Sequence, residues 1–213
     1  MAGKQTKQTS ARKNLRDSYT VPGIDVAEGQ KLAKQLQSCL HNLNDLHLTL
    51  KHAHWNVVGP KFIGVHKMLD PQVEAVREMT DTIAERMATM GVSPNGLPGA
   101  IVAERTWDDY DVNRAPGVEH LAALDLVYDG VITDHREALA RVSDVDPITE
   151  DMLIGQVRGL ELFQWFMRSH IESGSGVLEH AGARTEKAAA KSVAGGKGAA
   201  KSSRASGKAS KKK

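Results

Sequence analysis

Two histidines and three carboxylates are spaced along residues 54–85 in a way that suits metal binding. They are His54, His66, Asp70, Asp81 and Glu85. His66 and Asp70 are four residues apart, as are Asp81 and Glu85, while Asp70 and Asp81 are separated by eleven, about three turns of an α-helix. On a single helix these four side chains would point to roughly the same side. Histidine and carboxylate ligands suit iron, manganese or zinc, and a mixed set with open positions favours non-haem iron.

The length of such a helix limits how these residues could share one ion. At a rise of about 1.5 Å per residue, Asp70 and Asp81 are roughly 16 Å apart along the axis, and His66 and Glu85 roughly 28 Å. One copy of the helix therefore cannot close the site. A second copy, antiparallel across a twofold axis, would bring His66 and Asp70 of one chain to Asp81 and Glu85 of the other, creating two identical sites. The alternative is that these residues form the solvated face of an amphipathic helix.

Four segments of the chain have the apolar periodicity of amphipathic helices. Glycine, proline and capping residues mark their ends. Between the second and third segments lies a long connection, residues 91–117, in which a short helix is expected from Gly99 to Trp107. Short turns inside each pair and one long link predict an all-α, antiparallel four-helix bundle. The four helices are expected at about 25–58, 61–90, 117–143 and 146–180.

The candidate ligands lie beside the apolar stripes of their helices. His54, His66 and Asp70 each follow a stripe residue by one position, so they lie on a helix flank, about 100° from the residues that face the core. A second subunit would pack on such a flank. His47 shares this position and could join the interface. His135 instead falls on the stripe of the third helix and is expected to be a buried, hydrogen-bonded residue.

The residues around these ligands resemble a known family. The segment AHWNVVGPKFIGVHKMLD (53–70), followed by DTIAER (81–86), is similar to the signature of the Dps proteins, mini-ferritins named as DNA-binding proteins from starved cells. The resemblance extends over most of residues 25–180, including LFQWFMRSHIE (162–172). It implies a ferritin-like fold and a ferroxidase site at a dimer interface. The implied ligands, none of which departs from the family's pattern, are His54, His66, Asp70, Asp81 and Glu85.

The resemblance also implies an assembly and a reaction. Dps proteins form hollow dodecamers, oxidise Fe²⁺ with hydrogen peroxide in preference to oxygen, and store the ferric mineral. Iron bound in pairs at each inter-subunit site is therefore the expected cofactor and cargo. The helix pattern by itself requires only a dimer.

Two further groups match positions that have roles in this family. Trp55 and Trp165 correspond to aromatic residues near the iron site, where they could intercept oxidising equivalents or serve simply in packing. Asp146, Glu150 and Asp151, with the nearby Asp144, resemble the region that lines the family's threefold pores. Carboxylates around a symmetry axis would guide Fe²⁺ inward. The alternative for this acidic group is helix capping and favourable first-turn charges.

Composition divides the chain into an acidic centre with basic ends. Its 213 residues have a formal net charge of +2. Residues 1–16 carry +5 and residues 182–213 carry +9, which leaves −12 for the segment between them. Three parts are therefore expected: a basic arm at 1–24, the bundle at 25–181, and a Lys-rich tail at 182–213 that is too poor in apolar residues to fold.

The basic tail indicates a nucleic-acid partner. It is similar to the tails of linker histones and of some actinobacterial Dps proteins. Lysines that neutralise phosphates release counterions, so binding should weaken with salt, and without aromatic residues no sequence specificity is expected. The other interpretation is a solubilising tail. The residues expected to contact DNA are Lys191, Lys197, Lys201, Arg204, Lys208, Lys211, Lys212 and Lys213.

Cysteine and hydropathy patterns indicate the compartment. Cys39 is the only cysteine and lies on an apolar stripe, so it is expected to be a core residue in a reducing cytosol. The sequence shows neither a secretory signal nor a membrane span. The leading hypothesis is a cytoplasmic, nucleoid-associated ferroxidase and iron store that binds DNA. The alternatives are a nucleoid-compacting protein with little or no ferroxidase turnover, and a zinc or manganese store without redox chemistry.

Overall fold

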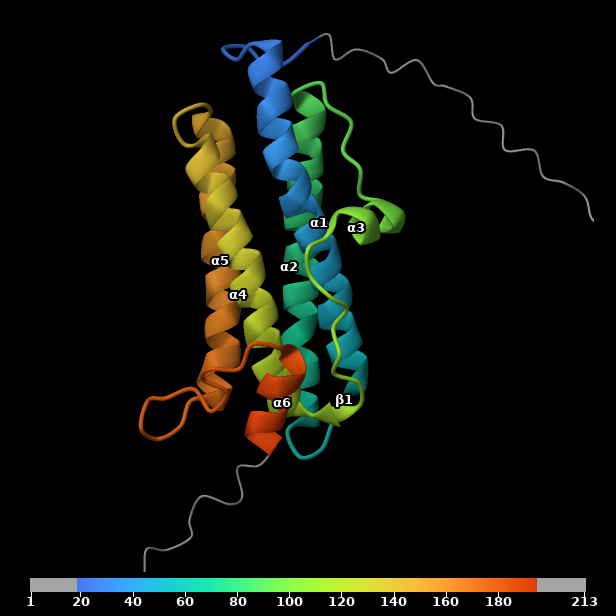
Figure 1. Cartoon of the computed structure of the whole chain (residues 1–213), viewed down its shortest axis with the longest axis vertical. Helices are drawn as coiled ribbons and strands as arrows, with labels where there is room; N and C mark the ends of the chain where they lie inside the picture. The colour runs from blue at the N-terminus through green and yellow to red at the C-terminus, as the bar shows by residue number, and fades with distance from the viewer. Residues whose placement is uncertain (1–18, 195–213) are drawn as a thin grey trace, which may run out of the picture.

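The bundle predicted from the sequence is confirmed by a computed structural model that describes residues 19–194 (Figure 1). Four long helices form two antiparallel pairs, α1 with α2 and α4 with α5, and two shorter helices, α3 and α6, lie on the outside. The long helices are α1 (Val26–Asn56), α2 (Phe62–Thr89), α4 (Gly117–Val142) and α5 (Pro147–Ile171). The short helices are α3 (Pro98–Glu104) and α6 (Glu186–Ala194).

The ends of the long helices follow from local chemistry. Asp25 caps α1 by accepting a hydrogen bond from the backbone N–H of Glu28 at 2.8 Å. Asp146 caps α5, with Pro147 in the first turn, where the missing N–H has no cost. After α2 the chain turns at Gly91, whose φ of +79° is one that residues with a Cβ rarely adopt.

The core lies along the bundle axis between the four long helices. Leucines of the α1 stripe, such as Leu36 and Leu43, are fully buried. Cys39 and His135 are fully buried too, as the sequence predicted. The largest fully buried side chain, Tyr128 of α4, donates its hydroxyl proton to Gln72 Oε1 of α2 at 2.7 Å, so its polar atom is satisfied inside the core.

The long connection crosses from one end of the bundle to the other, because α2 and α4 run in the same direction (Figure 1). At its far end, strand β2 (Ala115–Pro116) pairs in parallel with strand β1 (Val57–Val58), which follows α1 directly. Val57 is in register with Ala115. The sequence analysis predicted no strands, and a pair this short has no alternation that could reveal it.

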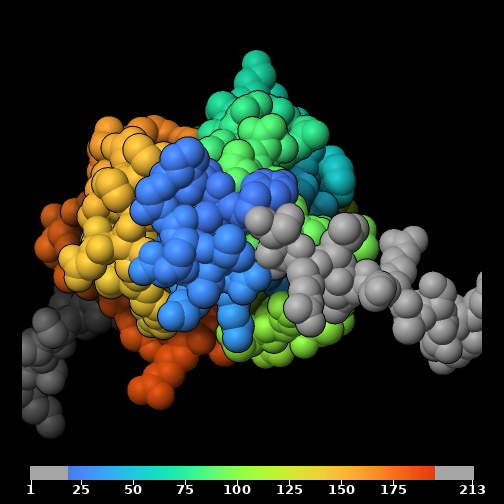
Figure 2. All heavy atoms as spheres, turned by 90° about the horizontal axis from the view of Figure 1, so that it is seen from above, coloured from blue at the N-terminus to red at the C-terminus, as the bar shows by residue number. Residues whose placement is uncertain are grey.

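The opposite end of the bundle is where α1 begins. Figure 2 looks onto this end and shows the first turns of α1 between the α4–α5 turn on one side and the segment that follows α2 on the other. The two ends of the described chain therefore leave from opposite ends of the bundle, the N-terminal one here and the C-terminal one beside β1 (Figure 1).

The structure differs from the sequence-based expectation in three segments. The short crossover helix ends at Glu104 and does not reach residue 107. Helix α5 ends at Ile171, well before residue 180, because the chain becomes extended at Glu172 and pairs with Leu178 in a single bridge. The expectation that the chain is unfolded from residue 182 onward was wrong for α6. Most of the basic arm (1–18) and the tail from residue 195 lie outside the described residues.

Helix α6 folds because its few apolar residues share one face. Ala189, Ala190 and Val193 are buried, and their small side chains let the helix lie close against α4. Lys187 adds an ion pair with Asp111 of the crossover, with 2.7 Å between Nζ and Oδ2. Across residues 19–194, no helix combines the length and apolar character that a membrane span needs.

Candidate metal centre

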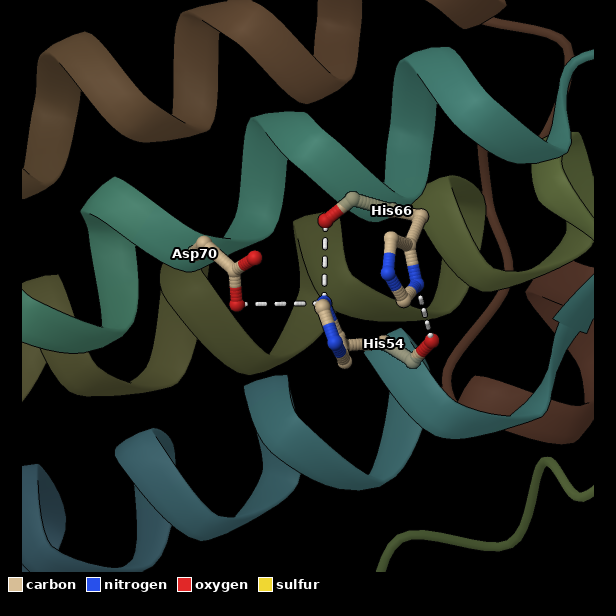
Figure 3. A group of neighbouring side chains, drawn as sticks. All are labelled: His54, His66 and Asp70. Atoms are coloured by element: carbon tan, nitrogen blue, oxygen red, sulfur yellow. Dashed lines mark hydrogen bonds and ion pairs between the residues drawn. The ribbon is translucent and has the colours of Figure 1, made fainter.

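Three of the five predicted ligands converge on one point of the chain (Figure 3). His54 lies in the last turn of α1, and His66 and Asp70 lie in the first turns of α2. The intervening turn reverses the chain, so that these two helix ends face each other. One potential ligand atom from each residue lies within 4.8 Å of the other two. This is the only group of three or more such residues found within the described part of the chain.

The two histidines hold each other in place. His54 Nδ1 is 2.9 Å from the carbonyl oxygen of His66, and His66 Nδ1 is 3.0 Å from the carbonyl oxygen of His54. Their rings are stacked, with 3.6 Å between centroids. Because a carbonyl can only accept, each Nδ1 must carry the proton. This leaves Nε2 of each ring as the nitrogen that could bind a metal ion.

The third residue, Asp70, supplies a negative charge that already has a partner. Its Oδ1 is 3.2 Å from His54 Nδ1 and 3.0 Å from the ammonium group of Lys51 on α1. The hydrogen bond from Lys51 is the main reason why the pKa of the Asp70 carboxyl is lowered. The carboxylate is thus ionised at neutral pH, and a metal ion at this site would compete with Lys51 for it.

Lys51 is a member of this group that the sequence analysis missed. It precedes His54 by three positions, nearly one helical turn, so both residues lie on the same side of α1. The ammonium group also lies 5.9 Å from the centroid of the Trp55 ring. Trp55 is largely exposed, with 69% of its surface accessible, and Trp165 on α5 is also exposed. The structure of one chain does not test their predicted roles.

The remaining two predicted ligands do not join this group. Asp81 and Glu85 are exposed on the outer face of α2, further along the helix. Asp81 borders a surface groove between α1 and α2 that is also lined by His47 and Glu78. Burial lowers the pKa of His47, which favours its neutral form. Within one chain, His47 therefore lies in the same groove as Asp81 and not in the group that contains His54.

The candidate pore residues differ from one another in burial. Asp146 is buried and accepts hydrogen bonds from Thr149 and from Arg86, whose Nη2 is 2.5 Å from Oδ2. Burial alone would raise the pKa of Asp146, but these hydrogen bonds and the Arg86 charge outweigh it and lower the pKa. Helix capping, the alternative interpretation, is therefore the role that the structure shows for Asp146. Asp151 is exposed and Glu150 is partly exposed, and their pore role stays a prediction.

The arrangement as a whole suits a hard or borderline divalent ion. Two imidazoles and one carboxylate leave several coordination positions open, as in non-haem iron sites. Asp70 is half-exposed, so the site can be reached from the surface. Carboxylates from a neighbouring molecule could occupy the open positions.

Comparisons with known proteins agree with the fold. The ferritin-like domain family matches residues 33–177. The DNA protection during starvation protein of Mycolicibacterium smegmatis is 56% identical over 173 residues, which cover 81% of this chain and 94% of that protein. A solved structure of Mycobacterium smegmatis Dps has a TM-score of 0.77 at 56% identity, covering 79% of this chain and 97% of the other. For DpsA14 from Streptomyces coelicolor the TM-score is 0.73 at 57% identity, with coverages of 76% and 96%.

Proposed function

Because the chain belongs to the Dps family of ferritin-like proteins, we propose that it oxidises Fe²⁺ at sites shared between two subunits and stores the ferric product inside an oligomer. The observation that carries the proposal is the reciprocal hydrogen bonding of His54 and His66 through Nδ1, which leaves Nε2 of both rings without a hydrogen bond to the other's backbone, in a group that also contains Asp70. A dodecamer is expected from the family resemblance, and the site itself needs two copies.

The chemistry follows from the ligands on each side of the interface. His54, His66 and Asp70 of one copy would bind Fe²⁺, and Asp81 and Glu85 of a second copy would complete a place for two iron ions. One molecule of hydrogen peroxide takes one electron from each of two ferrous ions. It also takes up two protons and is reduced to two water molecules. Paired oxidation avoids the hydroxyl radical that a single electron would produce. Carboxylates then stabilise Fe³⁺, which prefers oxygen ligands.

Mixed oligomers test whether the site is shared. One variant carries His66→Ala and Asp70→Ala, and the other carries Asp81→Ala and Glu85→Ala. In a heterodimer, one of the two sites receives both intact halves, while the other receives both damaged halves. Random co-assembly of equal amounts should therefore restore about a quarter of the wild-type sites.

The assay is ferric absorbance after anaerobic Fe²⁺ loading and addition of peroxide. Each variant alone, and the two mixed without reassembly, should show little turnover. A site formed within one chain predicts no recovery after co-assembly, so an inactive mixed oligomer of correct size would contradict the proposal. Turnover absent from the wild type as well would favour the nucleoid-compacting alternative. Tight Zn²⁺ or Mn²⁺ binding without iron oxidation would favour the metal store.

We also propose that the basic tail binds DNA through its phosphates. The support is compositional: the charged residues from Lys197 to Lys213 lie outside the described structure, whereas Lys191 is exposed on α6. Helix α6 holds the start of this segment at one end of the bundle (Figure 1). Several tails on one oligomer would act together on one DNA molecule and increase its apparent affinity.

The packing of α6 decides where the tail should be cut. Deleting residues 195–213 leaves α6 in place, whereas deletion from residue 182 would expose the surface of α4 that α6 covers. We expect the shorter deletion to abolish salt-sensitive retardation of DNA without changing oligomer size. A tail of the same length with glutamine in place of each lysine and arginine separates charge from bulk. Undiminished binding at low salt would shift the assignment to the basic arm at residues 1–16.

A further inference from the structure

A cavity of about 300 Å³ lies between α1, α4 and the crossover, and one residue of α6 also lines it. The crossover runs along α1 here (Figure 1) and is held by a hydrogen bond from the indole N–H of Trp107 to Asp45 Oδ2 at 2.8 Å. A volume of this size is at the lower end of the range for small-molecule sites. Nothing in the proposed iron or DNA chemistry uses this cavity.

The wall of the cavity combines apolar and aromatic surface with negative charge. Leu46 of α1 and Val131 of α4 supply apolar surface, and the crossover residues Trp107 and Tyr110 supply aromatic rings. Four acidic residues line the same cavity, and no lysine, arginine or histidine is among the described residues that do so. Such a wall suits an organic cation, because carboxylates attract its charge while apolar and aromatic groups cover its carbon atoms. The four acidic residues are Asp45, Asp108, Asp134 and Glu186.

Two of these carboxylates are already held in place, each through one oxygen. Asp45 accepts the Trp107 hydrogen bond through Oδ2, and Asp134 accepts one from Asn42 Nδ2 through its own Oδ2 at 2.7 Å. Within residues 19–194, neither carboxylate makes a hydrogen bond or ion pair through Oδ1. Burial raises the pKa of Asp45, so a cation beside it would offset the cost of its charge. Both side chains are therefore oriented and retain an oxygen that could accept from a ligand.

A buried threonine adds an unsatisfied hydroxyl to the same wall. Thr49 of α1 lines the cavity and is only 7% exposed, yet its hydroxyl has no hydrogen-bond partner among the described residues. Other helical threonines, such as Thr80 and Thr133, donate to the carbonyl oxygen four residues earlier at 2.8 Å. A buried hydroxyl without a partner is costly, and an ammonium group in the cavity would satisfy it.

The acidic residues surround the cavity instead of meeting at one point. Across the described part of the chain, the His54 group is the only set of three or more potential ligands close enough to share one ion. A divalent metal would need several oxygens at one point. Separated carboxylates around apolar surface match a flexible molecule whose charges are separated by methylene groups. We propose that this cavity binds an aliphatic diamine or polyamine, with its ammonium groups at the carboxylates and its carbon chain against the apolar and aromatic wall.

The cavity is separate from the proposed iron site. Asp45 and His47 are two positions apart on α1, or about 200° around the helix, so their side chains leave opposite sides of it. His47 lies in the groove that also contains Asp81. Binding of an amine therefore does not depend on iron, and the inference goes beyond the proposed function: loss of iron oxidation and loss of amine binding are separate results.

Calorimetric titration of the full-length assembled protein with cadaverine, a five-carbon diamine, tests the proposal. We expect saturable binding that pentanediol, which has hydroxyls in place of the amines, does not reproduce. Asp45→Asn and Asp134→Asn each keep an oxygen for the existing hydrogen bond, and each should weaken binding by about tenfold or more. Asp144→Asn removes the same charge from an exposed position in the α4–α5 turn and is the matched control, with an expected change below about twofold.

A cavity-filling variant separates a defined site from general attraction of cations to an acidic surface. Gly130 of α4 lines the cavity, and a Cβ added there would meet no atom within 4 Å. Gly130→Leu keeps all four acidic residues and should abolish cadaverine binding. Its thermal midpoint should not fall, because leucine favours a helix more than glycine does. Gly155→Leu on α5, where an added Cβ also meets open space, is the control that should still bind.

Three results would overturn the proposal. The first is the absence of saturable binding up to about 1 mM cadaverine. The second is binding that Gly130→Leu leaves unchanged, which would mean that the amine binds elsewhere on the surface. The third is binding that appears only after deletion of residues 195–213, because a lysine of the tail would then be the occupant of the cavity.

Discussion

Replacing Lys51 with methionine should strengthen metal binding at the half-site. The ammonium group of Lys51 lies 3.0 Å from Asp70 Oδ1, where it occupies the carboxylate that a metal ion would need. Methionine keeps most of the aliphatic length of the side chain and removes the charge. The change therefore eliminates both a competitor for Asp70 and a positive charge beside the bound ion.

The size of the effect follows from the exposure of the pair. The side chains of Lys51 and Asp70 are 30% and 50% exposed, so the ion pair that the metal replaces is worth only about 0.2–1 kcal/mol. A divalent ion about 5 Å from the ammonium is repelled by about 1.7 kcal/mol in water, and physiological salt reduces this by roughly half. Because the lysine can move away, we expect a net gain of about 1–1.5 kcal/mol, or five- to tenfold in affinity.

Calorimetric titration with Zn²⁺ in the absence of oxidant measures this directly. The gain should shrink as ionic strength rises, because its electrostatic part is screened. Lys67→Met removes a charge from an exposed position next to His66 and is the matched control, with an expected change below about twofold. Unchanged or weaker binding by Lys51→Met at low salt would mean that Lys51 orients Asp70 for the metal rather than competing with it.

Three further predictions concern stability and reactivity. Asp146→Ala removes a cap and leaves the Arg86 guanidinium unpaired, so urea unfolding should show a loss of about 3–5 kcal/mol. The folded-state pKa of Asp146 is lowered, so its contribution to the free energy of unfolding is present above the ordinary aspartate pKa. This contribution is lost as the pH falls through the lowered value. The stabilities of the variant and the wild type should therefore become equal in strong acid. Burial raises the pKa of Cys39 to about 12, so its thiol should not ionise at mild alkaline pH. An alkylating reagent should therefore modify the denatured protein but not the native protein. Rapid labelling of the native protein would show that the core opens. Gly91→Ala would place a Cβ 2.3 Å from the Tyr19 carbonyl oxygen at a φ of +79°. The thermal midpoint of the variant should therefore fall. An unchanged midpoint would mean that this turn is not held in the native state.

The bundle could be predicted from the sequence because apolar residues recur at helical spacing in each of its long helices. Buried residues such as Leu36 and Leu43 recur at helical spacing, and Asp25 and Pro147 mark where helices begin. At the end of α5 the expected helix was too long, because residues 172–176 are polar or glycine and the backbone turns there. Helix α6 was missed because a segment with few large apolar residues is typical of disorder, and the α4 surface that buries it is not visible in the local sequence.

The site could be predicted only in part, for a related reason. His54, His66 and Asp70 belong to helices with a short turn between them, so their proximity follows from the hairpin. The contact of Lys51 with Asp70 depends on the conformation of a long side chain, which no spacing specifies.

The crossover and the metal residues are connected through the same turn of the chain. The reciprocal bonds between His54 and His66 hold the last turn of α1 against the first turns of α2, and β1 lies in the segment between them. Since β1 pairs with β2, this turn also fixes the end of the crossover that precedes α4. The position of the end of the crossover relative to the metal residues is therefore set by one local structure. Loss of the β1–β2 pairing should disturb the end of the crossover before it disturbs the histidines, whose bonds to each other do not involve the crossover.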